Sequence, residues 1–303
     1  MQNMEIFLQQ LVNGLTIGSM YALIALGYTM VYGVLKLINF AHGDLVALAA
    51  YVGLTIYTQI LGAAAPSIWV VFFMFIASAF VIAIVGVILE RSAYRPLRKA
   101  PRLSAVVSAL GASMVIQNGI MLIWGAQIKI FPAEIIPSKT FQIGGVFISS
   151  MQLIILFLSI ILMTALYFYI NKTKSGAAIR ASAIDQDAAR LMGINVNGII
   201  VKIFILGSSL GAVGGLFIGM FYRGIYFNMG WIYGLNAFVA AIIGGIGNIP
   251  GAMVGGMLLG LFNAMIAGYI SSVWADAFTY ILLITILVFR PTGILGERVA
   301  EKV

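Results

Sequence analysis

The chain has 303 residues, of which 62% are hydrophobic and only 9% charged, and its mean hydropathy is +1.08. A soluble domain carries roughly 25% charged residues, so this composition excludes a soluble protein and indicates one embedded in a lipid bilayer. The net charge of +8 does not indicate a nucleic-acid partner, because the basic residues gather in loops between apolar runs, as membrane orientation requires.

Residues needed for several kinds of chemistry are missing. The chain has no cysteine, which excludes disulfides and iron–sulfur clusters, and its single histidine, His42, argues against a histidine-based metal site. No GxxxxGK[ST], GxSxG or HExxH pattern occurs. We therefore expect no catalysis and no bound cofactor on this chain. A cleaved signal peptide is not expected either, because no Lys or Arg precedes the first apolar run.

The apolar runs are near 20 residues long, which favours membrane-spanning helices over barrel strands of about 10 residues. We predict an all-α polytopic bundle of eight or nine segments, forming one domain over residues 1–303. In chain order the expected segments are 13–34, 45–61, 68–89, 103–124, 151–170, 199–221, 235–246, 252–270 and 273–289. The count is open around 235–250, where a short apolar run meets a break. The loop at 125–150, which contains Pro132, Pro137, Gly144 and Gly145, predicts an extended or hairpin excursion.

The fourth expected span, 103–124, is too polar for a helix that faces only lipid. Its polar residues are Ser104, Ser108, Ser113, Gln117 and Asn118. Gln117 and Asn118 are candidates to line a translocation path. Hydrogen bonding between helices within the fold is the alternative interpretation.

The distribution of Lys and Arg predicts which side faces the cytoplasm. Five of these residues lie in 91–102, five in 172–202, three from Arg290 onward, and Lys36 adds one. Only Lys129, Lys139 and Arg223 fall on the opposite side. We therefore expect the N-terminus outside and the loops at 91–102 and 171–198 in the cytoplasm.

The loop at 171–198 contains the longest polar stretch, SGAAIRASAIDQDAARLMGINV. Ser182 and Asp185 form an S-x-x-D pattern that predicts a helix start. Asp187 in the first turn and Arg190 in the last complement the helix dipole, and Gly193 can end the helix in a left-handed conformation. One face is apolar and comprises Ile184, Ala188, Leu191 and Met192. This face predicts either docking to a partner protein or contact with the lipid interface.

Two segments interrupt the helical pattern, and irregular backbone at membrane depth is tolerated only against protein or a water-filled path. The first, INFAHGD, contributes Asn39, His42, Gly43 and Asp44 as candidates for a translocation path. The second, GGIGNIPG, contributes Gly244, Gly245, Asn248 and Pro250. Discontinuous helices in corresponding positions of a chain point to a transport site. The alternatives are an ordinary cytoplasmic turn with Lys36 and Asp44 at the surface, and a tight turn between packed helices.

Glycines also recur at four-residue spacing, which lets helices approach closely. The series are 211, 215 and 219; 247, 251 and 255; and 256 and 260. We interpret them as packing positions.

Four motifs in this order resemble the H-type permease of branched-chain amino-acid ABC importers. They are INFAHGD after YALIALGYTMVYGV, the loop GAAIRASAIDQDAARLMGIN, GGIGNIPGAMVGG, and the ending FRPTGILG. The resemblance covers essentially the whole chain. It implies an ABC importer permease fold with discontinuous or re-entrant helices, in the bacterial inner membrane.

The resemblance also implies partners. A second homologous permease would complete the path, two ATPase subunits would bind ATP and Mg²⁺, and a periplasmic binding protein would deliver leucine, isoleucine or valine. Such permeases contact their ATPases through a Glu-Ala-Ala, three-residue gap, Gly pattern. Asp187-Ala188-Ala189 followed by Gly193 matches that spacing, with Asp in place of Glu. The implied coupling residues are Arg180, Asp185, Asp187, Ala188, Ala189, Arg190, Leu191 and Gly193.

Other functions are open at this point. A related ABC importer could carry urea, short amides or other amino acids. A stand-alone secondary transporter would need ionisable residues within its spans, and this chain has almost none.

Overall fold

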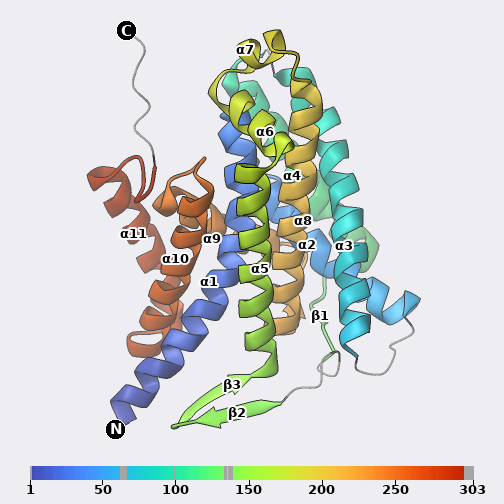
Figure 1. The fold of residues 1–303 in the computed structure, drawn as a ribbon. Helices are drawn as coiled ribbons and strands as arrows, with labels where there is room; N and C mark the ends of the chain where they lie inside the picture. Colours follow the sequence, from blue (N-terminus) through green and yellow to red (C-terminus); the bar gives the residue numbers. More distant parts are fainter. Residues whose placement is uncertain (1, 62–66, 99, 133–134, 136–138, 297–303) are drawn as a thin grey trace.

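In a computed structural model, the chain folds as a bundle of long helices with short β-strands at one end (Figure 1). The structure describes residues 2–61, 67–98, 100–132, 135 and 139–296. The α-helices are α1 Gln2–Leu35, α2 His42–Thr55, α3 Ile68–Leu89, α4 Arg102–Trp124, α5 Ser150–Lys172, α6 Lys174–Ile184, α7 Gln186–Leu191, α8 Val196–Tyr222, α9 Met229–Gly244, α10 Ile249–Tyr269 and α11 Ala275–Phe289.

Several helices continue into tighter or wider turns. A π-helical turn, Ile56–Ile60, extends α2, and another, Glu90–Tyr94, extends α3 into the 3₁₀ turn Arg95–Leu97. A further 3₁₀ turn, Ser272–Trp274, precedes α11. The interior of the basic loop expected at 91–102 is therefore largely helical.

Within the described residues, eight helices are long and apolar enough to cross a membrane, which agrees with the predicted polytopic bundle. The open question at 235–250 is answered by α9, a helix of 16 residues that begins at Met229. At 1.5 Å per residue it is about 24 Å long, short of the roughly 30 Å hydrocarbon core.

The first helix begins at Gln2, earlier than the span expected from residue 13. Its polar start packs against the β-hairpin rather than lipid. The Gln9 side chain donates to the Phe147 carbonyl at 3.0 Å and accepts from the Phe147 N–H at 2.8 Å. Hydropathy alone does not show this contact, because it joins residues 138 positions apart.

The hairpin expected within 125–150 is present as β2, Thr140–Ile143, paired antiparallel with β3, Val146–Ser149. Gly144 and Gly145 form its turn with φ of +54° and +84°, the left-handed values that two-residue hairpin turns favour. A second ribbon joins β1, Lys129–Ile130, to β4, Gly224–Ile225. Pro137, part of the loop expectation, lies outside the described residues.

The core forms around α1, which packs against α10, α8, α9 and α5. The closest approach between helices is that of α10 to α1, at glycine positions of α10 that were predicted from the sequence. A Cβ added at Gly256 would overlap the backbone of Ala22, and one at Gly260 would overlap the backbone of Gly18. These glycines are packing positions, as the spacing indicated.

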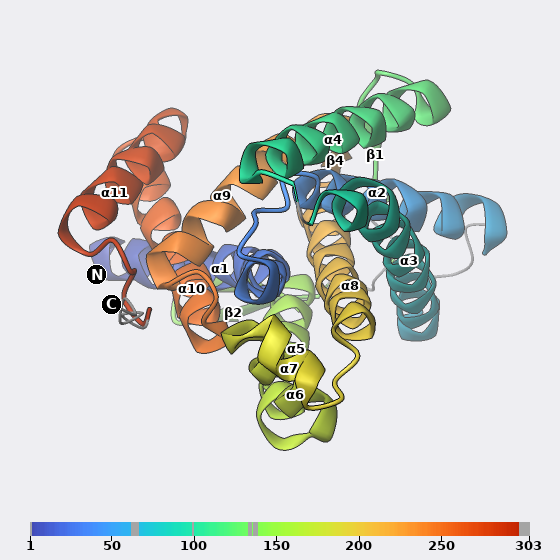
Figure 2. The same cartoon turned by 90° about the horizontal axis from the view of Figure 1, so that it is seen from above.

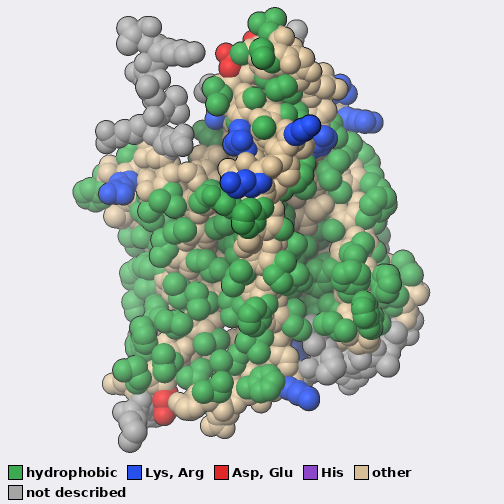
Figure 3. Space-filling view, in the orientation of Figure 1, with side chains coloured by type: hydrophobic (Ala, Val, Ile, Leu, Met, Phe, Trp, Pro, Cys, Tyr) green, Lys and Arg blue, Asp and Glu red, His purple; other side chains and the backbone are tan. Residues whose placement is uncertain are grey.

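The two ends of the bundle differ in charge. Most of the visible Lys and Arg side chains lie toward the end that carries α6 and α7, above a broad hydrophobic belt (Figures 1 and 3). The N-terminus and the β2–β3 hairpin lie at the other end (Figure 1). This separation matches the predicted orientation, with α6 and α7 on the cytoplasmic side. Three of the basic residues counted, Lys99, Arg298 and Lys302, lie outside the described residues.

Candidate functional sites

The polar loop at 171–198 forms two helices, not one. Asp185 separates them, because its extended backbone (φ −152°, ψ 113°) ends α6 and starts α7. Its side chain caps α7 by accepting from the N–H groups of Asp187 at 2.9 Å and Ala188 at 3.0 Å. The predicted start at Ser182 is therefore wrong: Ser182 is buried inside α6, whose N-terminal cap is Thr173.

The end of α7 agrees with the sequence pattern. Asp187 lies in the first turn and Arg190 in the last, and their side chains form an exposed ion pair at 2.7 Å. Gly193 follows the helix with φ of +81°, a conformation that a β-branched residue adopts only with strain. Arg180, by contrast, turns toward the body of the protein and donates to the carbonyl of Ile170 near the end of α5.

The apolar face of this segment has no cover in the described structure. Ile184, Leu191 and Met192 are 87%, 89% and 82% exposed, and Ala188 is exposed beside them. Ala189 is buried and faces the bundle. The segment stands beyond the level of most Lys and Arg side chains, away from the hydrophobic belt (Figure 3). That position favours a partner protein over lipid as the surface that would cover it.

One hydrogen bond ties α7 to the central helix. The Gln186 side chain donates to the carbonyl of Val34, in the last turn of α1, at 2.8 Å. No local sequence pattern indicates this contact, because the two residues are 152 positions apart. Gln186 is thus a functional candidate that sequence reasoning missed.

The INFAHGD segment follows directly on that last turn of α1. Lys36 takes a left-handed conformation (φ +53°) and breaks the helix, and α2 begins at His42. Asn39, His42 and Asp44 are only 2%, 1% and 4% exposed. The alternative of a surface turn is therefore wrong for Asp44, although Lys36 is exposed. The break lies inside the bundle, between α4 and α9 when viewed from above (Figure 2).

Each buried polar residue of this segment has a partner from another element. Asn39 accepts from the Tyr94 hydroxyl at 2.9 Å. The His42 Nε2 atom lies 3.2 Å from the carbonyl of Ile24. Asp44 accepts from the Ser113 hydroxyl of α4. Gly43 packs against the backbone of α9. The four candidates thus face different neighbours, on α1, α4, α9 and the turn after α3, and do not converge on one site.

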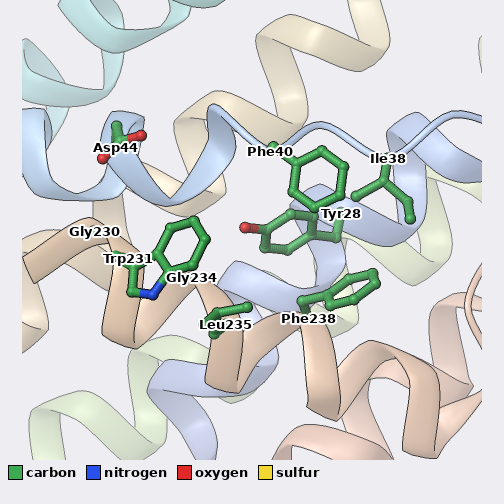
Figure 4. A pocket seen from close by; sticks show the side chains of 9 residues that line it. All are labelled: Tyr28, Ile38, Phe40, Asp44, Gly230, Trp231, Gly234, Leu235 and Phe238. Carbon is green, nitrogen blue, oxygen red and sulfur yellow. The ribbon is translucent and has the colours of Figure 1, made fainter. Parts of the chain in front are cut away.

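A pocket opens beside this segment (Figure 4). It is lined by Tyr28, Ile38, Phe40, Asp44, Gly230, Trp231, Gly234, Leu235 and Phe238. Its walls come from α1, the 36–41 connection, the start of α2, and α9. Most of its lining is apolar or aromatic, with Asp44 the single charged group. Trp231 is 56% exposed and stands at the surface.

The structure does not bring Gln117 and Asn118 to this pocket. Asn118 is exposed and donates to the carbonyl of Met114 on its own helix. Ser108 and Ser113 do form contacts within the fold, to the Ala93 carbonyl and to Asp44. Ser108 and Ser113 therefore bond inside the subunit, whereas Asn118 is exposed and Gln117 is half-buried.

GGIGNIPG forms a tight turn between α9 and α10, on the α7 side of the bundle (Figure 1). Asn248 caps α10 by accepting from the Gly251 N–H at 2.9 Å, and Pro250 occupies the first turn. Gly244 packs against Gly251, and Gly245 has φ of +108°. The C-terminal segment closes this turn, because the N–H groups of Ile294 and Leu295 bond to Ile243 and Gly244. None of these residues lines the pocket.

A buried ion pair stands near the cytoplasmic end of α3. Glu90 is fully buried and accepts from Arg98, whose guanidinium also donates to Asn197 at 2.7 Å. Burial lowers the pKa of Arg98, and the Glu90 carboxylate opposes that shift. The pair joins the turn after α3 to the start of α8, next to the loop that carries α7.

Comparison with known proteins gives a consistent result over nearly the whole chain. The profile of the family described as branched-chain amino acid transport system / permease component matches residues 10–287. The chain is 42% identical to the high-affinity branched-chain amino acid transport system permease protein BraD of Pseudomonas aeruginosa, over 98% of both chains.

It is also 40% identical to the corresponding permease protein LivH of Escherichia coli K12, again over 98% of both chains. A probable branched-chain amino acid transport permease protein LivH of Methanocaldococcus jannaschii is 30% identical, over 92% of this chain and 89% of that one. No solved structure matches the chain. By the extent of these matches, the chain belongs to the family of branched-chain amino acid transport permease components, and the eight apolar helices of spanning length among its described residues agree with this.

Proposed function

We propose that this chain is the inner-membrane permease subunit of an ABC importer for leucine, isoleucine and valine. The observation that carries the proposal is its similarity to BraD and LivH over 98% of its length. The chain contains no P-loop, so ATP and Mg²⁺ belong to separate ATPase subunits and this chain catalyses nothing itself.

The proposed docking site for an ATPase is α7 with its flanking residues. Three large apolar side chains are exposed there, at the cytoplasmic end, on a helix capped at both ends. Ile184, Leu191 and Met192 would fill a groove on the ATPase, as an amphipathic helix does. Asp187 and Arg190 would lie at the polar rim of the same contact.

The proposed mechanism is alternating access driven by that contact. A ligand-driven conformational change needs an element with two arrangements that both sites bias. The Gln186–Val34 bond joins α7 to the end of α1, and the end of α1 leads directly into the buried break before α2. Movement of α7 is thereby transmitted to the pocket. A second permease completes the path, and a binding protein docks on the outer segments 125–150 and 222–233.

Co-purification tests the composition of this assembly. Gentle extraction of the tagged chain from its native membrane should recover two ATPase subunits and one further permease, identified by mass spectrometry. Recovery of the chain alone, at expression levels where the ATPases are present in the same membrane, would contradict the proposal.

Two variants test α7 as the coupling element. Asp187→Asn removes the negative charge, and Gly193→Val places a β-branched residue at φ of +81°. Both should leave ATP hydrolysis running while leucine uptake falls. Asp276→Asn, an exposed acidic residue at the start of α11, is the matched control. Wild-type uptake by both α7 variants would refute this role.

A further inference from the structure

The buried ion pair between Glu90 and Arg98 is incomplete. Glu90 is the first residue of the π-helical turn that extends α3, and its Oε1 atom accepts from the Nη2 atom of Arg98. In the described part of the chain, neither Oε2 of Glu90 nor Nε of Arg98 has a hydrogen-bond partner. Burying a polar atom without a partner is costly, and each such atom in a folded protein calls for an explanation.

The two unpaired atoms are complementary to each other. An arginine binds a carboxylate most strongly through two parallel N–H···O bonds. The Nη2–Oε1 bond is present, and Nε and Oε2 are the donor and the acceptor that a second, parallel bond would use. The pair is therefore one bond short of bidentate, and a second arrangement, in which Glu90 accepts both bonds, lies close to the observed one.

The third nitrogen of the Arg98 guanidinium holds it to the start of α8. The Nη1 atom donates to Oδ1 of Asn197 at 2.7 Å, and Asn197 is an exposed residue in the first turn of α8. Only residues 192–195 separate α7 from α8, and the N–H of Ile194 bonds back to the carbonyl of Ala189 at 3.0 Å. Because this connection is short and bonded to α7, a displacement of α7 also displaces Asn197.

The same π-helical turn contacts the buried break between α1 and α2. Tyr94, its last residue, is 1% exposed, and its hydroxyl donates to Oδ1 of Asn39 at 2.9 Å. The Nδ2 atom of Asn39 likewise has no partner among the described residues. Single π-helical turns occur frequently at functional sites. This one joins the Arg98 side chain to the connection that borders the pocket.

We propose that Arg98 is a positioning residue for transport, which couples the start of α8 to the turn after α3 through two arrangements. In the arrangement of this structure, the guanidinium is shared between Glu90 and Asn197. In the other, the start of α8 has moved away with α7, and Arg98 makes both bonds to Glu90. The exchange trades one hydrogen bond for another, so a small bias from α7 selects between the two arrangements. The inference rests on the proposed function, because it takes α7 as the contact with the ATPases.

Asn197→Ala tests this exchange, because it removes the exposed acceptor and leaves the buried pair in place. In proteoliposomes with the complete assembly, the number of leucine molecules imported per ATP should fall about fivefold, as expected for one hydrogen bond. The thermal unfolding temperature in detergent should stay unchanged, because the second bond to Glu90 replaces the lost one. A merely structural bond of the same strength would instead lower that temperature by about 2 °C. Asn171→Ala is the matched control, since that exposed amide bonds only within α5.

Two further variants separate the bond from other effects of the substitution. Asn197→Asp keeps an acceptor oxygen at the same position and should retain the wild-type import per ATP. Arg98→Lys keeps the charge but lacks the planar fork that bonds to two groups at once, so import per ATP should fall. The double variant Arg98→Lys/Asn197→Ala should then be no worse than Arg98→Lys alone.

Several results would overturn the inference. They are wild-type import per ATP by Asn197→Ala, an equal loss in Asn197→Asp, a lowered unfolding temperature of Asn197→Ala, and multiplied losses in the double variant. If Arg98→Lys does not assemble, the comparison of Asn197→Ala with Asn197→Asp decides alone. No leucine uptake by the unmodified assembly would instead refute the proposed function.

Discussion

Removing the side chain of Gln186 tests the link between α7 and the interior of the bundle. Gln186→Ala deletes one hydrogen bond of 2.8 Å, from the side-chain amide to the Val34 carbonyl, and leaves the cap and apolar face of α7 intact. A neutral hydrogen bond contributes about 1 kcal/mol net, and that free energy corresponds to roughly a fivefold change in an equilibrium. We therefore expect the coupling between ATP hydrolysis and transport to weaken by about fivefold.

The quantity to measure is the number of leucine molecules imported per ATP hydrolysed in proteoliposomes that contain the whole assembly. Gln186→Ala should lower this ratio while the ATPases remain bound and hydrolyse ATP. Asn171→Ala is a matched control, since that amide donates at 3.0 Å to the Tyr167 carbonyl of its own helix and joins no other element. A wild-type ratio for Gln186→Ala would refute the reasoning.

Two further predictions concern stability of the bundle. Gly256→Val should lower the thermal unfolding temperature in detergent, because the new side chain overlaps the backbone of Ala22 and forces α10 away from α1; such overpacking costs about 1–3 kcal/mol or more. An unchanged unfolding temperature would contradict this packing. Glu90→Gln leaves the Arg98 guanidinium, 14% exposed, without its carboxylate, which should cost about 3–5 kcal/mol. A double-mutant cycle with Arg98→Gln measures the pair directly, and additive losses would show that the two side chains do not interact.

The spanning helices were predictable because length and apolarity determine them. The runs at 68–89 and 103–124 match α3 and α4 within a residue. Their surroundings were not predictable in the same way. Hydropathy cannot separate a helix in the core from one that faces lipid: α1 is the central helix, yet it is less apolar than the peripheral α3.

The loop at 171–198 shows what a local sequence pattern can predict about a helix and what it cannot. Capping chemistry correctly indicated a helix stop at Gly193, with Asp187 in the first turn and Arg190 in the last. It did not indicate the ion pair between these two side chains. It misplaced the start, because Ser182 and Asp185 both match a helix-start pattern and only burial of Ser182 in α6 distinguishes them. That burial depends on tertiary packing.

The pocket could be predicted only in part. Asp44 stood out in the sequence because a charge near an apolar span is unusual. The other residues that line the pocket did not stand out in the sequence. Leu235 and Phe238 are apolar residues in an apolar segment, and they become distinctive only when α9 packs beside the break before α2. The second break, at GGIGNIPG, had four glycines and a proline, a stronger interruption than INFAHGD, yet it formed a turn closed by the C-terminal segment.

ATP-driven uptake of radiolabelled leucine into proteoliposomes tests the central claim most directly. The assembly should contain this chain, its partner permease, both ATPases and the binding protein. We expect uptake that requires ATP, the ATPases and the binding protein together, and no leucine flux through liposomes that hold this chain alone. Leucine flux through the chain alone, or no uptake by the complete assembly, would contradict the account.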